Sequence, residues 1–263
     1  MSPASRLRPL RALIGILLAL PTSGAVAAEL MVAVASNFAA PLQQIASSFE
    51  RSTGHSVRLV PGSTGKLYAQ ITNGAPFDVL VAADQQAPKQ LAAEGYAVGD
   101  SQFTYAIGKV VLWSPLKGYV DDRGQILTKG GFRHLSVANP ALAPYGAAAV
   151  AAMQRLGVYD SLKPKIVQGE NITQAHQFVS TGAAELGFVA LSQVLKDGKI
   201  EGSAWILPQE LYPPLRQDAI LLGKGRGNPA AAPFLAYLTS DAARAVIASF
   251  GYGQGPPRNR QTP

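Results

Sequence analysis

The sequence predicts an α/β protein of two lobes, in which two doubly wound mixed sheets are joined by two crossover segments. Short apolar runs alternate with amphipathic stretches of helical length, which is typical of sheets covered by helices on both faces. Two long extended stretches, residues 103–113 and 217–222, interrupt this alternation and are expected to join the lobes. The 263 residues are 48% hydrophobic and include no cysteine, so the core has to be stable without disulfides.

The first 28 residues have the order of parts that a secretory signal needs. Three arginines precede the apolar run ALIGILLAL at residues 12–20, and small residues follow it up to Ala28. Because this run is too short to span a bilayer as a helix, we expect a signal peptide at residues 1–28 and export of the remainder. An uncleaved N-terminal anchor is the alternative.

The part after the signal begins with three pairs of a strand and a helix. Apolar runs predict strands at residues 30–35, 56–60 and 77–82. Helices are predicted at residues 38–51, 66–72 and 86–94. In the first helix, Leu42, Ile45 and Phe49 recur at helical spacing. This order of elements indicates an open parallel sheet.

A second alternation follows the extended stretch at residues 103–113, which is rich in β-forming residues and has Gly108 in its middle. Strands are predicted at residues 135–138, 166–167 and 186–191, with helices at 145–156 and 173–181. Two closing helices are predicted at residues 229–238 and 241–250. Gly251 caps the last one.

These elements divide into two lobes. We expect residues 29–105, completed by residues 216–263, to form lobe I, and residues 106–215 to form lobe II. One continuous doubly wound sheet is the alternative. No internal repeat is evident.

The charge balance gives no indication of a nucleic-acid partner. The chain has 23 Lys and Arg against 16 Asp and Glu, and three of the arginines lie in the predicted signal peptide. The excess that remains is mild. Arg258 and Arg260 lie in a tail rich in Pro and Gly, which is more simply a solvated terminus.

Four loops between a predicted strand and a helix carry the candidate ligand-binding residues, because ligands of parallel sheets bind where strands end and helices begin. The loops are residues 35–38, 61–66, 139–146 and 169–172. Their candidate residues are Ser36 and Asn37, Ser63 and Thr64, Tyr145, and Ile172. Helix capping alone is an adequate explanation of each loop taken separately. The glycine spacing before Lys66 does not match a nucleotide phosphate loop.

None of the four loops presents a compelling cation to a ligand. The start of a helix instead carries about half a positive charge and N–H groups without helical partners. Several helix starts that converge from both lobes could therefore hold a dianion without Arg or Lys. We hypothesise that the cleft closes on binding, because the donors come from both lobes.

An enzyme is the main alternative class, and the sequence argues against it. None of the three histidines, His55, His134 and His176, falls in the four loops. The G-x-S-x-G nucleophile motif is absent. A bound iron ion would need clustered Tyr, His and carboxylates, and an organic zwitterion would usually need an Arg. Sulfate or phosphate binding, and a secreted hydrolase as the weaker case, stay open as alternatives.

Five segments resemble the periplasmic molybdate-binding proteins of ABC importers, and the resemblance extends from about residue 29 to residue 252. The segments are SNF, GSTGKLYAQI, NGAPFDVLVAADQ, FTYAIGKVVLW and NPALAPYG. The resemblance implies a type II periplasmic-binding-protein fold and a periplasmic location. It also implies capture of molybdate, and of tungstate, for delivery to an ABC permease and its ATPase, with no cofactor and with a monomer as the default state.

The resemblance further implies the composition of the site. In the family, hydroxyls and backbone N–H groups hold molybdate without a counter-ion, so molybdenum is present only as the oxyanion and has no direct protein ligands. Carried over by position, the donors are Ser36 with Asn37, Thr64 with Ser63 as its alternative, and the N–H groups of Tyr145 and Ile172. Some members use a tyrosine hydroxyl where this chain has Ala190. Asn37 is the candidate for the donor that is missing there.

Overall fold

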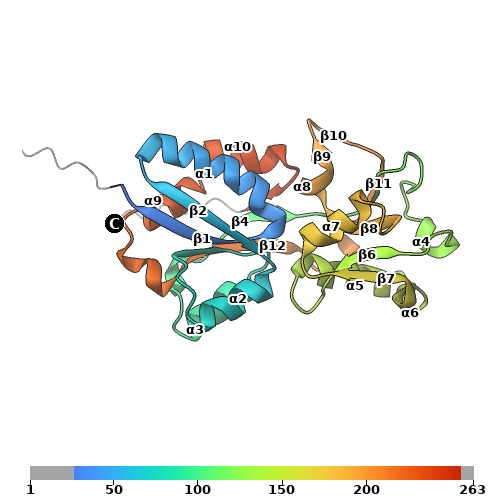
Figure 1. The fold of residues 1–263 in the computed structure, drawn as a ribbon, viewed down its shortest axis with the longest axis horizontal. Helices are drawn as coiled ribbons and strands as arrows, with labels where there is room; N and C mark the ends of the chain where they lie inside the picture. Colours follow the sequence, from blue (N-terminus) through green and yellow to red (C-terminus); the bar gives the residue numbers. More distant parts are fainter. Residues whose placement is uncertain (1–26, 256–263) are drawn as a thin grey trace, which may run out of the picture.

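The computed structural model describes residues 27–255, and Figure 1 shows two α/β halves arranged along the longest axis of the molecule. Nearly all of the predicted signal peptide, residues 1–28, lies outside the described residues, as does the tail from residue 256. The described chain forms two large mixed sheets and one two-stranded sheet. The predicted α/β fold with two mixed sheets is therefore confirmed.

The six-stranded sheet has the order β13-β4-β12-β3-β1-β2. Its strands are β1 (Glu29–Ala35), β2 (Ser56–Gly62), β3 (Val79–Val81), β4 (Phe103–Gly108), β12 (Leu215–Leu221) and β13 (Gly253–Gln254). β1 pairs in parallel with β2 and β3, whereas β12 pairs antiparallel with β3 and β4. We call this sheet and its helices the six-stranded half.

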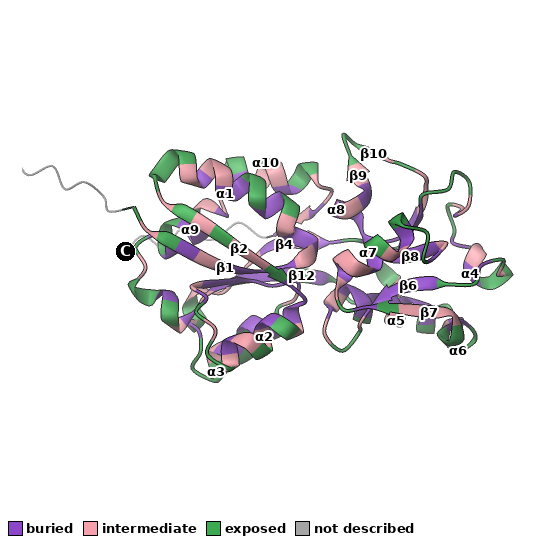
Figure 2. Ribbon diagram, viewed as in Figure 1, coloured by how far each residue is buried: buried purple, intermediate pink, exposed green. Residues whose placement is uncertain are grey.

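Helices cover both faces of the six-stranded sheet (Figure 1). One core cluster includes side chains of α1 (Ala39–Thr53), α9 (Ala231–Tyr237) and α10 (Asp241–Ser249). Another includes side chains of α2 (Thr64–Thr72) and α3 (Gln86–Ala93). Most residues of β1 are buried because both faces are covered, which explains its nearly continuous apolar sequence (Figure 2).

The five-stranded sheet has the order β11-β5-β8-β6-β7. Its strands are β5 (Val110–Ser114), β6 (Leu135–Ala138), β7 (Ile166–Gly169), β8 (Leu186–Ala190) and β11 (Ser203–Ile206). Helices α5 (Pro144–Arg155) and α7 (Ile172–Ser180) pack against it. The smaller elements are α4 (Ile126–Lys129), α6 (Tyr159–Leu162), α8 (Leu191–Val194), β9 (Leu195–Lys196) and β10 (Lys199–Ile200). We call this sheet and its helices the five-stranded half.

The first crossing between the sheets lies in the predicted stretch at residues 103–113. The second comes before the predicted stretch at residues 217–222, most of which belongs to β12 of the six-stranded sheet, so that prediction is wrong in its position. The extended stretch at residues 103–113 is two strands of different sheets, β4 and β5, with only Lys109 between them. The second crossing leads from β11 to β12. The exact lobe boundaries, residues 29–105 with 216–263 and residues 106–215, stay a prediction.

Strand register brings the four candidate loops together in pairs. Ala35 at the end of β1 pairs with Gly62 at the end of β2, so the loops after these strands begin at the same level of the sheet. Ala138 at the end of β6 pairs in the same way with Gly169 at the end of β7. Each half therefore presents two neighbouring loops at one edge of its sheet.

Candidate functional site

A small cavity between the two halves brings all six predicted site residues together. Its lining consists of Ala35, Ser36, Asn37, Gly62, Ser63, Thr64, Ala83, Ala143, Pro144, Tyr145 and Ile172. The cavity volume is about 10 Å³, on a measure by which one water molecule needs roughly 10–15 Å³. The cavity as it stands therefore has room for about one water molecule, and any larger guest requires its walls to move apart.

Among the described residues that line this cavity, none has a charged side chain. Tyr145 is the one with an ionisable group, and burial raises the pKa of its hydroxyl well above the ordinary value. The cavity wall is therefore neutral at physiological pH. Any positive potential has to come from the starts of α2, α5 and α7, whose first residues or caps lie in the wall.

The start of α7 leaves one N–H group for a ligand. Asn171 is the N-cap, and its Oδ1 accepts from the N–H groups of Thr173 at 2.9 Å and Gln174 at 3.1 Å. The Ala175 N–H donates to the carbonyl of Asn171 at 3.1 Å. Within residues 27–255, the Ile172 N–H has no protein acceptor. Capping by Asn171, as the sequence predicted, thus singles out Ile172 as the free donor.

The start of α5 also leaves one backbone N–H group for a ligand. Pro144 at the first helical position has no N–H group, and proline is well tolerated there. The N–H groups of Gly146 and Ala147 donate to the Ala143 carbonyl at 2.9 and 3.1 Å. In the described part of the chain, the Tyr145 N–H is left without a protein acceptor.

The hydroxyl of Ser63 is the most informative group of the six-stranded half. Ser63 is the N-cap of α2, yet its side chain makes no capping hydrogen bond. Its Oγ is buried and has no partner among residues 27–255. Buried hydroxyls nearly always have a partner, so an unpaired one at a cavity points to a ligand. The neighbouring Thr64 Oγ1 accepts from the Ala83 N–H at 3.0 Å.

Helix capping does not explain the first loop. The N-cap of the short 3-10 turn Ser36–Phe38 is Ala35, and the N-cap of α1 is Phe38. Neither Ser36 nor Asn37 therefore caps a helix with its side chain. The capping explanation considered for these two residues is wrong, whereas it is correct for Asn171.

The side-chain amide of Asn37 is bonded within the protein. Its Nδ2 donates to Gln217 Oε1 at 2.9 Å and to the Tyr252 hydroxyl at 3.0 Å. The Asn37 carbonyl accepts from Tyr252 at 2.7 Å and from Ser192 Oγ at 3.1 Å. The parts that Gln217, Ser192 and Tyr252 play here were not predicted from the sequence. A signal existed for Gln217, because Gln217 and Asp218 form a polar pair inside an otherwise mostly apolar strand.

The loops of the two halves touch each other around the cavity. The Gly65 N–H donates to the Leu142 carbonyl at 2.9 Å, and a Cβ on Gly65 would lie 3.1 Å from the Leu142 Cα. Lys66 Nζ and Glu170 Oε1 form an ion pair at 2.5 Å, with both side chains about half exposed. The two halves are thus in direct contact beside the cavity.

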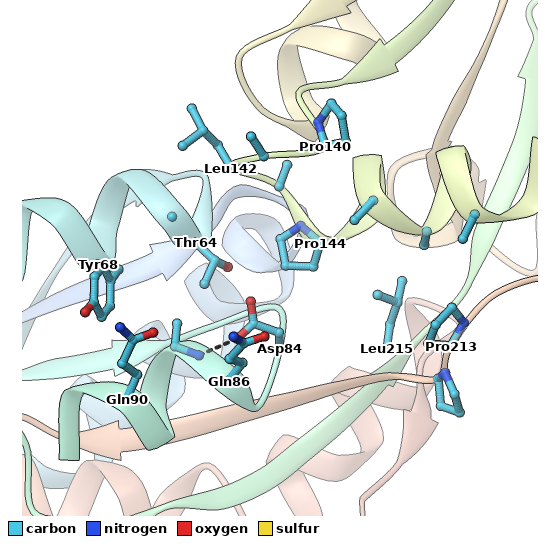
Figure 3. A pocket seen from close by; sticks show the side chains of 18 residues that line it. Thr64, Tyr68, Asp84, Gln86, Gln90, Pro140, Leu142, Pro144, Pro213 and Leu215 are labelled. Atoms are coloured by element: carbon cyan, nitrogen blue, oxygen red, sulfur yellow. Dashed lines mark hydrogen bonds between the residues drawn. The ribbon is translucent and has the colours of Figure 1, made fainter. Parts of the chain in front are cut away.

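A larger cavity of about 520 Å³ adjoins the small one and shares Thr64, Ala143 and Pro144 with it (Figure 3). Of the predicted donors, only Thr64 lines it. The Asp84 carboxylate lies in its wall, where it accepts the Ala87 N–H at 2.9 Å, and burial raises the pKa of this group. A carboxylate disfavours an anion, so we interpret this space as the outer part of the cleft.

No group of three or more His, Cys, Asp or Glu among the described residues could hold a metal ion. Of the helices that the structure describes, none has both the length and the apolar character needed to cross a membrane.

Comparisons with known proteins identify the family. Residues 30–253 match the family described as bacterial extracellular solute-binding protein. The chain belongs to this family. Solute-binding proteins of this kind are not enzymes, in agreement with the sequence analysis.

Several proteins are similar to this chain over most of their length and of its own. The molybdate-binding protein ModA of Azotobacter vinelandii is 57% identical over 228 residues, which covers 86% of this chain and 90% of the relative. ModA of Rhodobacter capsulatus is 49% identical, with 89% and 91% of the two chains covered. The solved periplasmic molybdate-binding protein of Azotobacter vinelandii superimposes with a TM-score of 0.83 and covers 85% of this chain and 98% of its own, at 41% identity.

Proposed function

We propose that this chain captures molybdate in the small cavity between its halves and delivers it to an ABC importer. The observation that carries the proposal is a neutral cavity wall with unpaired donors on both sides. These donors are the Ser63 hydroxyl in one half and the N–H groups of Tyr145 and Ile172 in the other. The names of the similar ModA proteins support molybdate as the solute.

The donors suit a doubly charged oxyanion, which has acceptors on every oxygen and no proton of its own. Hydrogen bonds to charged groups contribute about 1.5–3 kcal/mol each, because both charge and geometry favour them. Three helix starts add the field of their aligned peptide dipoles. Ser36 and Thr64 line the same wall and complete the proposed set of side-chain donors. Asn37 can join these donors only through its backbone N–H, because both of its side-chain N–H groups already have protein acceptors.

The same wall discriminates among oxyanions. Hydrogen phosphate keeps a proton, and a wall of donors would leave that proton unpaired at a cost of about 1–3 kcal/mol. Sulfate has no such proton and differs from molybdate mainly in size, so the size of the closed cavity has to exclude it. Tungstate is nearly the same size as molybdate, and we expect similar affinity for both.

Transport requires further partners and a location. We propose a permease and its ATPase as partners, and the periplasm as the location after removal of residues 1–28; the periplasmic location of the similar Azotobacter vinelandii protein supports the second part. We further propose that lobe I, residues 29–105 with 216–263, and lobe II, residues 106–215, open and close about the two crossovers. A radius of gyration that molybdate leaves unchanged in small-angle scattering would count against this movement.

The proposal is tested by thermal unfolding and calorimetry with molybdate, tungstate, sulfate and phosphate in parallel. Ligand at a hundred times its dissociation constant stabilises the folded protein by about 2.7 kcal/mol, which raises the unfolding midpoint measurably. We expect this shift with molybdate and tungstate and none with phosphate. A larger shift with sulfate than with molybdate would show that sulfate, and not molybdate, is the ligand. No shift with any of the four anions would overturn the proposal.

A further inference from the structure

A group of buried, uncharged side chains lies directly behind the cavity. Its members are Asn37, Tyr105, Tyr145, Ser192, Gln217 and Tyr252, and hydrogen bonds connect them. Burial raises the pKa of Tyr252 to about 12 and that of Tyr105 well above its ordinary value, so these hydroxyls stay neutral. Asn37 and Tyr145 also line the cavity, so this group connects the site to the protein interior.

Gln217 contacts both walls of the cavity from behind. Its Oε1 accepts from Asn37 Nδ2 at 2.9 Å and from the Tyr105 hydroxyl at 2.9 Å. Its Nε2 donates to the Tyr145 hydroxyl at 3.1 Å. Asn37 belongs to the six-stranded half and Tyr145 to α5 of the five-stranded half. One carboxamide thus joins the two halves at the residues that form the site.

The backbone around Gln217 is shaped for this contact. The pairing of β12 with β4 shifts register between Gln217 and Asp218, an irregularity that re-aims side chains. Gly108, at the end of β4, leaves the necessary space. A Cβ there would lie 2.2 Å from the Tyr145 hydroxyl oxygen and 2.5 Å from Gln217 Nε2. The contact therefore lies beside the first crossover, where movement between the halves would originate.

We propose that Gln217 is a positioning residue of the anion site, which couples the placement of Asn37 in one half to that of Tyr145 in the other. This inference rests on the proposed function. Gln217 is fully buried and does not line the cavity, so it acts through these two residues. Loss of its carboxamide would leave an Asn37 N–H group without its acceptor and remove a buried link between the halves.

The first test is Gln217→Met, which keeps the length of the side chain and removes its hydrogen bonds. We expect molybdate to bind about ten- to hundredfold more weakly, mainly through faster dissociation. The matched control is Gln102→Met. Gln102 also donates to a buried acceptor of the six-stranded half, Asp218 at 2.7 Å, but neither of its side chain's hydrogen-bond partners, Asp218 and the Gln85 carbonyl, lines the cavity. Its loss should change the affinity by less than about twofold.

Tyr145→Phe provides a second test that does not alter Gln217. It keeps the ring and the backbone N–H and removes only the hydroxyl that Gln217 contacts. We expect about threefold to tenfold weaker binding, the value of one buried hydrogen bond. In the double variant with Gln217→Met, the Tyr145 change should add clearly less than it costs alone, because the contact with Gln217 is already gone and only the one with the Tyr252 hydroxyl is left to lose.

Wild-type affinity in either folded single variant, or full additivity in the double variant, would overturn the role of Gln217. Should Gln217→Met fail to fold, Tyr145→Phe alone decides the question. The unsubstituted protein is measured alongside. If it does not bind molybdate, the proposed function fails and this inference fails with it, whereas binding by wild type and equally by both variants refutes the inference alone.

Discussion

The two walls of the cavity offer hydrogen-bond donors of different kinds. The six-stranded half contributes side-chain hydroxyls at Ser36, Ser63 and Thr64, whereas the five-stranded half contributes backbone N–H groups at Tyr145 and Ile172. A hydroxyl is lost with almost any substitution, but every residue except proline keeps its N–H. One wall therefore depends on side-chain identity and the other on backbone position.

The largest loss of affinity is expected from Ile172→Pro, which removes a backbone donor by substitution. Proline removes the N–H and is well tolerated at the first position of a helix, and the preceding Asn171 already has the extended backbone that proline favours. We expect molybdate to bind about ten- to hundredfold more weakly in calorimetry. Ile172→Val, which keeps the N–H, is the control. Equal losses in both variants would show that packing, and not the donor, matters here.

Ser63→Ala should have a smaller effect on affinity, about tenfold, because one of several hydroxyls is removed. The Ser63 Oγ has no partner within residues 27–255, so the unliganded variant should unfold at the same or a slightly higher temperature. Ser136→Ala is the matched control. The Ser136 hydroxyl does not line the cavity, and it donates to the Ala175 carbonyl over a distance of 2.8 Å. That variant should lose stability and keep its affinity. A destabilised Ser63→Ala would contradict this account.

Neutralising the ion pair that joins the two walls should reduce the affinity for molybdate by a still smaller factor. Lys66 and Glu170 are about half exposed, and exposed pairs contribute roughly 0–1 kcal/mol. We expect Lys66→Gln to weaken binding less than about threefold at low salt, and the difference should disappear as salt screens the pair. A large loss that persists at high salt would indicate that Lys66 contacts the anion, against the neutral character of the wall.

The smallest effect is expected from pH between 7 and 9. No described cavity residue titrates there, so the molybdate affinity measured by calorimetry should change by less than about twofold. The pKa of Tyr252 is raised to about 12 in the folded protein, so its contribution to stability is complete below pH 10 and is lost as pH rises toward 12. A binding step within pH 7–9 would reveal a charged group at the site.

Local sequence was sufficient to find the loops of the site. A strand end followed by a helix start is visible in residues 35–38 and 61–66, and parallel pairing then places such loops together. The free N–H groups of Tyr145 and Ile172 could also be anticipated, because they follow from Pro144 and from the Asn171 cap.

The support behind the site could not be predicted in the same way. Asn37, Gln217 and Tyr252 come from distant parts of the chain, and no local pattern pairs them. The strands β11 and β13 were also missed. Each is only a few residues long and lies at the edge of its sheet, where pairing on one side leaves little periodic signal.

The single residue between β4 and β5 has a mechanical consequence. Lys109 alone separates strands of different sheets, and the Tyr145 hydroxyl lies close to the neighbouring Gly108. If the halves rotate as rigid bodies about this residue, the bound anion lies close to the rotation axis, where a given rotation moves atoms least. α6, in contrast, lies at the far end of the five-stranded half, where the same rotation produces a large displacement (Figure 1). The arrival of one small ion would thus be amplified into a change of outer shape that a docking protein can detect.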